Sequence, residues 1–312
     1  MKLDETKIIE AIMAEKQAPI ASETAAALVE GWLARFIAED STRKVAAVET
    51  GFSIWLDAHT LIVGVLDAIF SDGDGYLGGE WKSKRAPRMT LAGRPYAGDT
   101  EEDWLQGITE GPQLAIYALA LHAGTFFEKG NPQPIEFQVQ NPRIMVRCAL
   151  KSDPPAYYPT KTSGIYTFTT EYLDSIESGL ASKANQIRGA RRNPDLVPWS
   201  LVGKPCREWG RPCPYLDPYC SKHAHPIGEA IAIFDANNPA YELALKRIDP
   251  ERLKDPDLVV LSASSYQTAV SCMEKFRLLN FHGGEKDTSI DLAIGSCMHA
   301  GIAEYLRQIK NA

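Results

Sequence analysis

The chain has 312 residues, of which 45% are hydrophobic and 23% charged, and its formal net charge is −7. This composition is typical of a soluble globular protein with one large domain or two modest ones. No apolar run approaches the roughly 18 residues that cross a bilayer. The negative charge argues against a protein that coats DNA, because phosphate binding depends on Lys and Arg. The first 16 residues are charged and contain no apolar signal core, which predicts a cytoplasmic protein.

The first half of the chain predicts a helical start followed by a strand meander. Residues 1–40 favour helix, because apolar side chains recur at helical spacing. The segment SDGDG, rich in residues that tolerate positive φ, predicts a tight turn between the second and third strands. The expected antiparallel strands cover residues 44–56, 61–70 and 76–84.

The second half predicts a more mixed pattern. Residues 86–103 favour a loop, and a helix becomes regular near Pro112 and runs to residue 123. Residues 193–226 are rich in Pro and Cys and too irregular for regular structure, so a metal is the economical way to hold them. The other expected elements are a strand over 134–142, a helix over 170–190, a linker over 247–258 and two helices within 259–312.

Two carboxylates and a lysine on adjacent strands suggest phosphodiester chemistry. Hydrolysis of a phosphodiester needs a hard cation that activates water, and oxygen ligands suit Mg²⁺ or Mn²⁺. Asp67 stands in an apolar strand, where a lone charge is costly unless it is paired or binds a metal. Glu80 and Lys82 project from one face of the next strand, and the SDGDG hairpin brings them beside Asp67. The alternative is a surface Glu–Lys pair with an Asp that caps a turn.

These residues resemble the RecB-type branch of the PD-(D/E)xK nucleases. That branch reads G-x-x-D, then D/E-x-K on the next strand, then Q-x-x-x-Y on the following helix, and the chain has GVLD, GEWK and QLAIY in that order. The resemblance implies an α/β fold of the restriction-endonuclease-like type, with a mixed central sheet flanked by helices. It also implies that Asp67 and Glu80 bind the metal and that Lys82 is the catalytic lysine. Gln113 and Tyr117 would position the lysine or the DNA strand, unless they only pack the helix.

Further segments extend the resemblance in an unusual order. Glu49 matches an E-x-x-F strand of that branch, as a group behind the metal or a second-metal ligand, unless it is simply exposed. RecB-type nucleases usually begin with a Ser-rich helix start, a Cys-containing helix and a G-x-x-x-H helix whose His binds the metal. Similar segments stand here at the C-terminal end, with His299.

Three arrangements explain that order. The chain is circularly permuted, which neighbouring termini tolerate, or the helices complete a neighbouring subunit, or they begin a second, truncated copy. We favour permutation. With either of the first two, His299 completes the metal site and favours Mn²⁺ somewhat; the alternative is a His packed in a core.

The cysteines resemble the iron–sulfur subset of the same branch, which includes CRISPR-associated and AddB-like nucleases. There, one Cys from an early helix, here Cys272, joins three late cysteines around a [4Fe–4S] cluster; the late ones here are Cys206, Cys213 and Cys220. The six-residue gaps differ from the more usual two and five, and Met273 stands where Pro usually follows. Zn²⁺ is the alternative metal, and reduced buried thiols are a third reading. His223 and His225 are alternative ligands, whereas Cys148 and Cys297 are expected as core residues.

Two basic runs are candidate phosphate contacts. Lys84, Arg85 and Arg88 follow the E-x-K strand and are expected to bind DNA, with Trp81 offering a stacking surface. The second run is equally well explained as a solvated face, and it consists of Arg188, Arg191 and Arg192.

The sequence therefore predicts a metal-dependent DNA nuclease, with exonuclease action on single-stranded or free ends implied by the resemblance. Recombination, repair or phage DNA processing is the expected setting, with a helicase or recombination partner or a homo-oligomer, and no membrane. The alternatives are a non-catalytic DNA-binding or assembly module that keeps the nuclease fold, and a zinc-binding scaffold. The expected domains are a nuclease core over 1–246 with a Cys-rich cap over 199–225, the linker 247–258, and a helical segment over 259–312 that completes the core in cis or in a neighbour.

Overall fold

The chain divides into two compact units in a computed structural model. Unit 1 comprises Met1–Phe52, Val65–Leu173 and Asp287–Ala312, and unit 2 comprises Ser53–Gly64 and Asp174–Lys286. The residues that the structure describes are 3–15, 18–73, 75–85, 107–108, 111–128, 133–151, 157–159, 164–192, 248–271, 273, 276 and 290–312.

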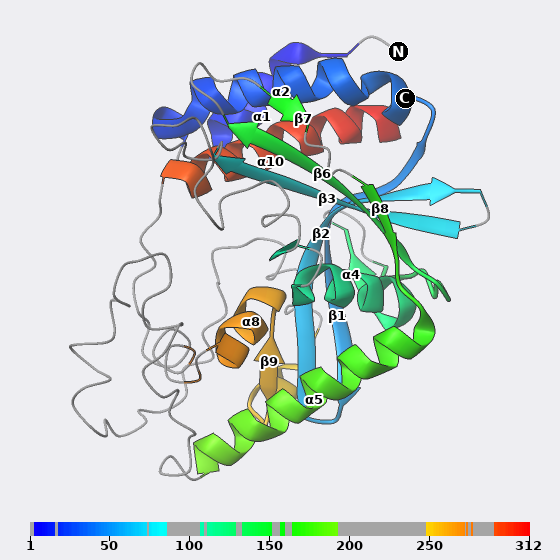
Figure 1. The fold of residues 1–312 in the computed structure, drawn as a ribbon, viewed down its shortest axis with the longest axis vertical. Helices are drawn as coiled ribbons and strands as arrows, with labels where there is room; N and C mark the ends of the chain where they lie inside the picture. The colour runs from blue at the N-terminus through cyan, green and yellow to red at the C-terminus, as the bar shows by residue number, and fades with distance from the viewer. Residues whose placement is uncertain are drawn as a thin grey trace, which may run out of the picture. The chain divides into compact units, whose positions relative to one another are not determined.

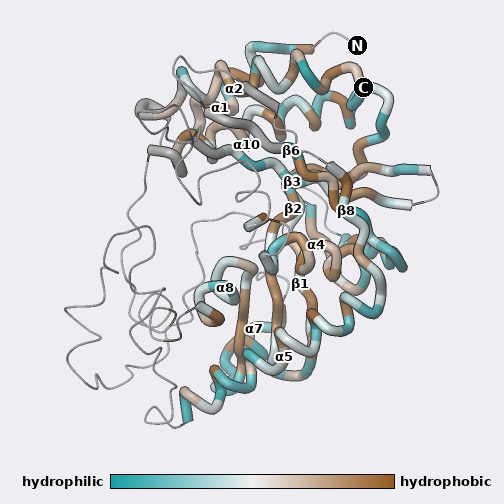
Figure 2. The backbone as a smooth tube through the Cα atoms, in the orientation of Figure 1, coloured by the Kyte–Doolittle hydropathy of each residue, from teal (hydrophilic) through white to brown (hydrophobic). Residues whose placement is uncertain are grey.

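Unit 1 is built on a mixed sheet in which strands neighbour one another in the order β5-β4-β1-β2-β3-β6-β7 (Figure 1). β2 and β3 form an antiparallel hairpin, β3 and β6 run parallel, and β8 pairs antiparallel with β6. Hydrophobic residues predominate along β2 (Figure 2). The expected mixed sheet is thereby confirmed. The strands are β1 Lys44–Asp57, β2 Thr60–Asp72, β3 Gly75–Arg85, β4 Thr125–Phe127, β5 Ile135–Glu136, β6 Arg143–Lys151, β7 Tyr157–Pro159 and β8 Gly164–Thr167.

Three helices from opposite ends of the chain pack together on unit 1. α1 (Glu5–Ala14), α2 (Ala18–Asp40) and α10 (Ile290–Lys310) lie side by side (Figure 1). The indole of Trp32 on α2 makes edge-on contacts with Trp81 of β3 and Tyr305 of α10, with ring centroids 5.6 and 5.5 Å apart. This aromatic cluster forms the core where α2, α10 and β3 meet. The C-terminal helix is therefore part of the same core as the N-terminal helices. Trp81 is 1% exposed, so the expected stacking surface for DNA was wrong: its ring packs against Trp32 and Phe70 instead.

A fourth helix, α4 (Pro112–Ala123), packs closely against β3. Its residues 114–121 are all buried, and Pro112 begins it, as the sequence predicts. Gly78 of β3 permits the close approach, because a Cβ there would lie 2.7 Å from Ile144 and 3.2 Å from Leu121 of α4. Two residues after that glycine stands Glu80, so the packing brings α4 beside the predicted site.

Unit 2 contains most of α5 (Thr170–Arg192) together with α7 (Pro250–Leu253), β9 (Val259–Leu261) and α8 (Ala263–Ser271). β9 pairs parallel with the first residues of β2, and α7 lies in the segment expected as a linker. The arginines of the second basic run bind residues of the same unit: Arg188 donates to Thr60 (2.9 Å), Arg191 to the Leu258 carbonyl (2.6 Å), and Arg192 pairs with Asp257 (2.6 Å).

One predicted strand was wrong in its position and length. The strand expected over 134–142 is reduced to β5, and the long strand is β6, which starts after Pro142. Gln138 adopts a φ of 49°, which ends extended structure there. Phe137 packs edge-on against Tyr76 and Phe126. It belongs to a loop whose apolar residues resemble the sequence of a strand. In the described parts of the chain, no helix has the length and apolar character needed to cross a bilayer.

Candidate active site

Asp67 and Glu80 stand just beyond the last paired residues of the β2–β3 hairpin. The register pairs Ala68 with Gly79, so each carboxylate is the next residue along its strand. Oδ2 of Asp67 accepts a hydrogen bond from the backbone N–H of Trp81 at 2.7 Å. Oδ1 of Asp67 lies 3.2 Å from Nδ1 of His299 on α10. The structure thus brings the C-terminal histidine to the carboxylate that the sequence singles out.

Glu80 is held by residues from β3 and α4. Its Oε1 contacts the ammonium of Lys82 and accepts a hydrogen bond from Gln113 at 3.1 Å. Gln113 donates its other amide hydrogen to the Tyr117 hydroxyl at 2.7 Å. Glu80 is only 1% exposed, and its buried Oε2 has no hydrogen-bond partner among the described residues. An unsatisfied buried carboxylate oxygen is costly, so this oxygen is available to a ligand.

The pKa values show how this group of charges is balanced. Burial raises the pKa of Glu80 to about 7, against the opposing charge of Lys82 and with the help of Asp67. Burial would lower the pKa of His299, but the Asp67 carboxylate outweighs it and raises that pKa to about 9. Burial would raise the pKa of Asp67, but His299 and the Trp81 N–H lower it. Near neutral pH, a protonated His299 therefore neutralises Asp67.

Glu49 lies on β1, the strand next to β2, which carries Asp67. Its carboxylate oxygen Oε2 contacts the guanidinium of Arg307 on α10. Burial and the neighbouring Asp67 raise the pKa of Glu49, and Arg307 opposes them. Sequence reasoning left the role of Glu49 open and missed Arg307. The available signal was its place on the His299 helix, eight residues further along.

The donor set suits a hard divalent cation. Two carboxylates and an imidazole are ligands that Mn²⁺ or Mg²⁺ accepts, and the unpaired Oε2 of Glu80 is the free acceptor that such an ion would use. Within the described residues, no group of three or more His, Cys, Asp or Glu side chains already has the spacing of a metal site. The site therefore has the ligand types that such an ion needs, in Asp67, Glu80 and His299. In this structure the same side chains pair with one another or with Lys82.

Cys297 is buried and free, as expected of a core residue. Several other residues named from the sequence fall where the structure gives no side-chain geometry. The backbone of Lys84 and Arg85 lies in β3, but their side chains are not described. Arg88 and the four cysteines Cys206, Cys213, Cys220 and Cys272 lie outside the described residues.

Comparison with known families bears directly on this geometry. A model of the PD-(D/E)XK nuclease superfamily matches residues 4–220, and a search of curated proteins finds no match. The matched segment is more than half of the chain and carries Asp67, Glu80 and Lys82, whereas His299 and Arg307 lie beyond it. With this match over a mixed sheet flanked by helices, the chain belongs to the PD-(D/E)XK nuclease superfamily.

Proposed function

We propose that the chain is a metal-dependent nuclease that hydrolyses phosphodiester bonds in DNA. The observation that carries the proposal is the buried Glu80, which has one unsatisfied oxygen, contacts Lys82 and lies close enough to Asp67 for its charge to raise the pKa of Glu80. A structural ion pair would not need a second carboxylate beside it, because like charges in a buried place destabilise each other. An incoming cation relieves that repulsion.

Each residue has a role in this proposal. Mg²⁺ or Mn²⁺, when bound, would polarise the phosphate and lower the pKa of water, and Asp67, Glu80 and His299 would hold it. The Lys82 ammonium contacts Glu80 and would donate a hydrogen bond to the charge that develops on the phosphate. Gln113 fixes the Glu80 carboxylate, and Tyr117 in turn fixes Gln113.

The finer activity rests on the resemblance to the RecB-type branch. We propose exonuclease action on single-stranded or frayed DNA ends, in recombination, repair or phage DNA processing, with or without a helicase partner. Lys84, Arg85 and Arg88 directly follow the E-x-K residues, so they are the proposed phosphate contacts beside the site.

The cysteines are proposed to hold a [4Fe–4S] cluster through Cys206, Cys213, Cys220 and Cys272, with Zn²⁺ as the alternative. The support is the sequence pattern and the irregular, proline-rich segment that three of them occupy. Iron and zinc content of the anaerobically purified chain distinguishes the two metals.

We further propose that α10 completes the site in cis, as in a circularly permuted nuclease. His299 lies against Asp67 of the same chain. The two ends of the chain also lie together: the backbone N–H of Asp4 donates to Gln308 at 2.8 Å, and Gln308 donates back to the Asp4 carbonyl at 3.0 Å (Figure 1). Adjacent termini are what a permuted order requires.

The decisive experiment is digestion of end-labelled single- and double-stranded DNA with Mn²⁺ or Mg²⁺. We expect cleavage by the wild type only with metal and a loss of about 10²–10³-fold in rate for Lys82→Ala, because a charge-stabilising donor is removed. The matched control is Lys254→Ala, which removes an exposed lysine of unit 2. If wild type and Lys82→Ala cut equally, the site assignment is wrong. If neither cuts but both bind DNA, the chain is a non-catalytic binding module.

A further inference from the structure

Each carboxylate of the site contacts a different nitrogen-bearing side chain, and α10 supplies two of these side chains. Both come from α10 positions about two helical turns apart, on a helix whose neighbouring residues are buried in the core of unit 1. The buried helix therefore fixes the positions of both side chains relative to the sheet. The pairs are Asp67 with His299, Glu80 with Lys82, and Glu49 with Arg307.

Glu49 is placed in an unusual way for a strand residue. Its φ is 45°, in the left-handed region that a residue with a side chain rarely adopts. Such backbone strain persists only where surrounding contacts hold it, and it gathers at functional sites. The side chain of Glu49 is 38% exposed, so burial alone does not lock its carboxylate in place. The contact that holds the carboxylate is the guanidinium of Arg307.

Arg307 is itself oriented by its own helix. Its second terminal nitrogen lies 3.6 Å from Oε2 of Glu304, one turn earlier on α10. One guanidinium therefore reaches two carboxylates, a geometry for which its planar fork is suited and an ammonium is not. Without Arg307, the Glu49 carboxylate would lose this ion-pair partner, while the like charge of Asp67 would still oppose its ionised form.

We propose that Arg307 is a positioning residue of the site, which fixes the Glu49 carboxylate on β1, the strand next to that of Asp67, so that Glu49 contributes to cation binding. The inference rests on the proposed nuclease function for its purpose. In this proposal, α10 supplies both the metal ligand His299 and Arg307, which orients Glu49.

The test is calorimetric titration of Mn²⁺ into the full chain without DNA. Arg307→Met is expected to weaken Mn²⁺ binding by about 10-fold or more, the usual effect of losing a partner behind a metal ligand. Arg307→Lys should recover part of the affinity, because it keeps the charge but not the fork. The matched control is Lys310→Met, which removes a cation of the same helix that pairs with Glu128 and with none of the proposed ligands. This variant should leave Mn²⁺ affinity unchanged.

A double-variant cycle separates positioning from general stabilisation. If Arg307 acts through Glu49, Arg307→Met in a Glu49→Gln background should weaken Mn²⁺ binding no further. An equal loss in both backgrounds would overturn the proposal. Tighter Mn²⁺ binding by Arg307→Met would also overturn it, because Arg307 would then be a competitor for Glu49.

The two proposals fail in different ways. A wild type that binds Mn²⁺ but cuts no DNA contradicts the nuclease function and leaves the Arg307 result readable. A wild type that cuts DNA while Arg307→Met keeps full Mn²⁺ affinity and full rate contradicts the positioning role alone.

Discussion

At the residue scale, two side chains of the site have raised pKa values, so a bound metal ion would have to displace their protons near neutral pH. Glu80 and His299 both have pKa values raised in the folded chain, to about 7 and about 9, from ordinary values of 4.5 and 6.5. A group with a raised pKa binds more protons when folded, so folding stability falls as pH rises between its two values. For Glu80 that window runs from its ordinary value to about 7, and for His299 from its ordinary value to about 9. Mn²⁺ or Mg²⁺ should bind more tightly as pH rises through these two windows, because fewer protons then compete for the ligands.

The resulting prediction concerns the metal-free chain. Its free energy of unfolding, measured by urea denaturation with a chelator present, should decline as pH is raised from about 5 to about 7. In Glu80→Gln the side chain no longer ionises, so this part of the decline should be smaller. Identical slopes in wild type and variant would show that Glu80 does not titrate in this window.

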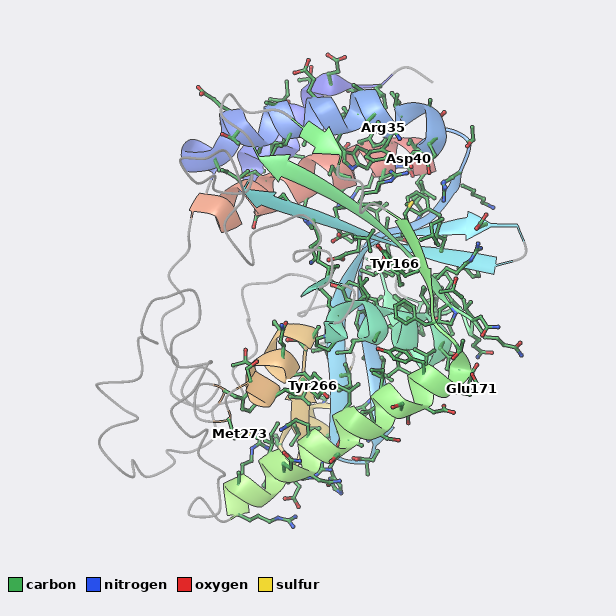
Figure 3. All side chains as sticks on the ribbon, viewed as in Figure 1. Arg35, Asp40, Tyr166, Glu171, Tyr266 and Met273 are labelled. Carbon is green, nitrogen blue, oxygen red and sulfur yellow. The ribbon has the colours of Figure 1, made fainter. Side chains whose placement is uncertain are left out.

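At the element scale, a buried ion pair ties α2 to β6. Asp40, the last residue of α2 and labelled in Figure 3, accepts two hydrogen bonds of 2.8 Å from Arg147. Both residues are at most 2% exposed, and the guanidinium lies 4.0 Å from the ring centroid of Phe36 and 5.5 Å from that of Trp81. The pair thus sits behind Trp81, whose backbone N–H holds Asp67.

Breaking one half of that pair should be severe. Asp40→Ala leaves the buried guanidinium with the half-exposed Glu39, 3.3 Å away, as its remaining ion-pair partner. The variant is expected to cost about 3 kcal/mol of unfolding free energy. The double variant Asp40→Leu with Arg147→Met replaces both charges by apolar groups and should recover most of the loss. Chemical denaturation measures both, with Lys254→Ala in an exposed pair as the control that should change little. A double variant as unstable as Asp40→Ala would contradict this account.

Local sequence patterns predicted the helices and strands well, but they did not predict which distant residues make contact. The SDGDG turn located the hairpin of β2 and β3, and two-residue spacing predicted that Glu80 and Lys82 share a face, as their contact shows. The pairing of Glu49 with Arg307 joins residues 258 positions apart, and no local spacing encodes it. Asp40 and Arg147 were missed for the same reason: each reads as an ordinary surface charge until the fold buries it.

At the scale of the whole molecule, the order of segments can be tested by rearranging them. Moving residues 287–312 in front of Met1 through a short flexible linker keeps every segment and changes only connectivity, and the Asp4–Gln308 contacts show that the ends meet. We expect the rearranged chain to unfold as cooperatively as the wild type and to bind Mn²⁺ equally. Deletion of 287–312 is the control and should abolish binding. A rearranged chain that folds but binds no Mn²⁺ would argue that α10 acts in a neighbouring subunit.

The late position of α10 in the chain has a consequence for synthesis. Asp67, Glu80 and Lys82 leave the ribosome more than 200 residues before His299 and Arg307. A nascent or prematurely terminated chain that stops before residue 287 carries the acidic residues without two of their cations, and lacks the helix that packs against α1 and α2. On the proposed mechanism such a product is inert towards DNA, so the cutting activity arises only once α10 has been synthesised.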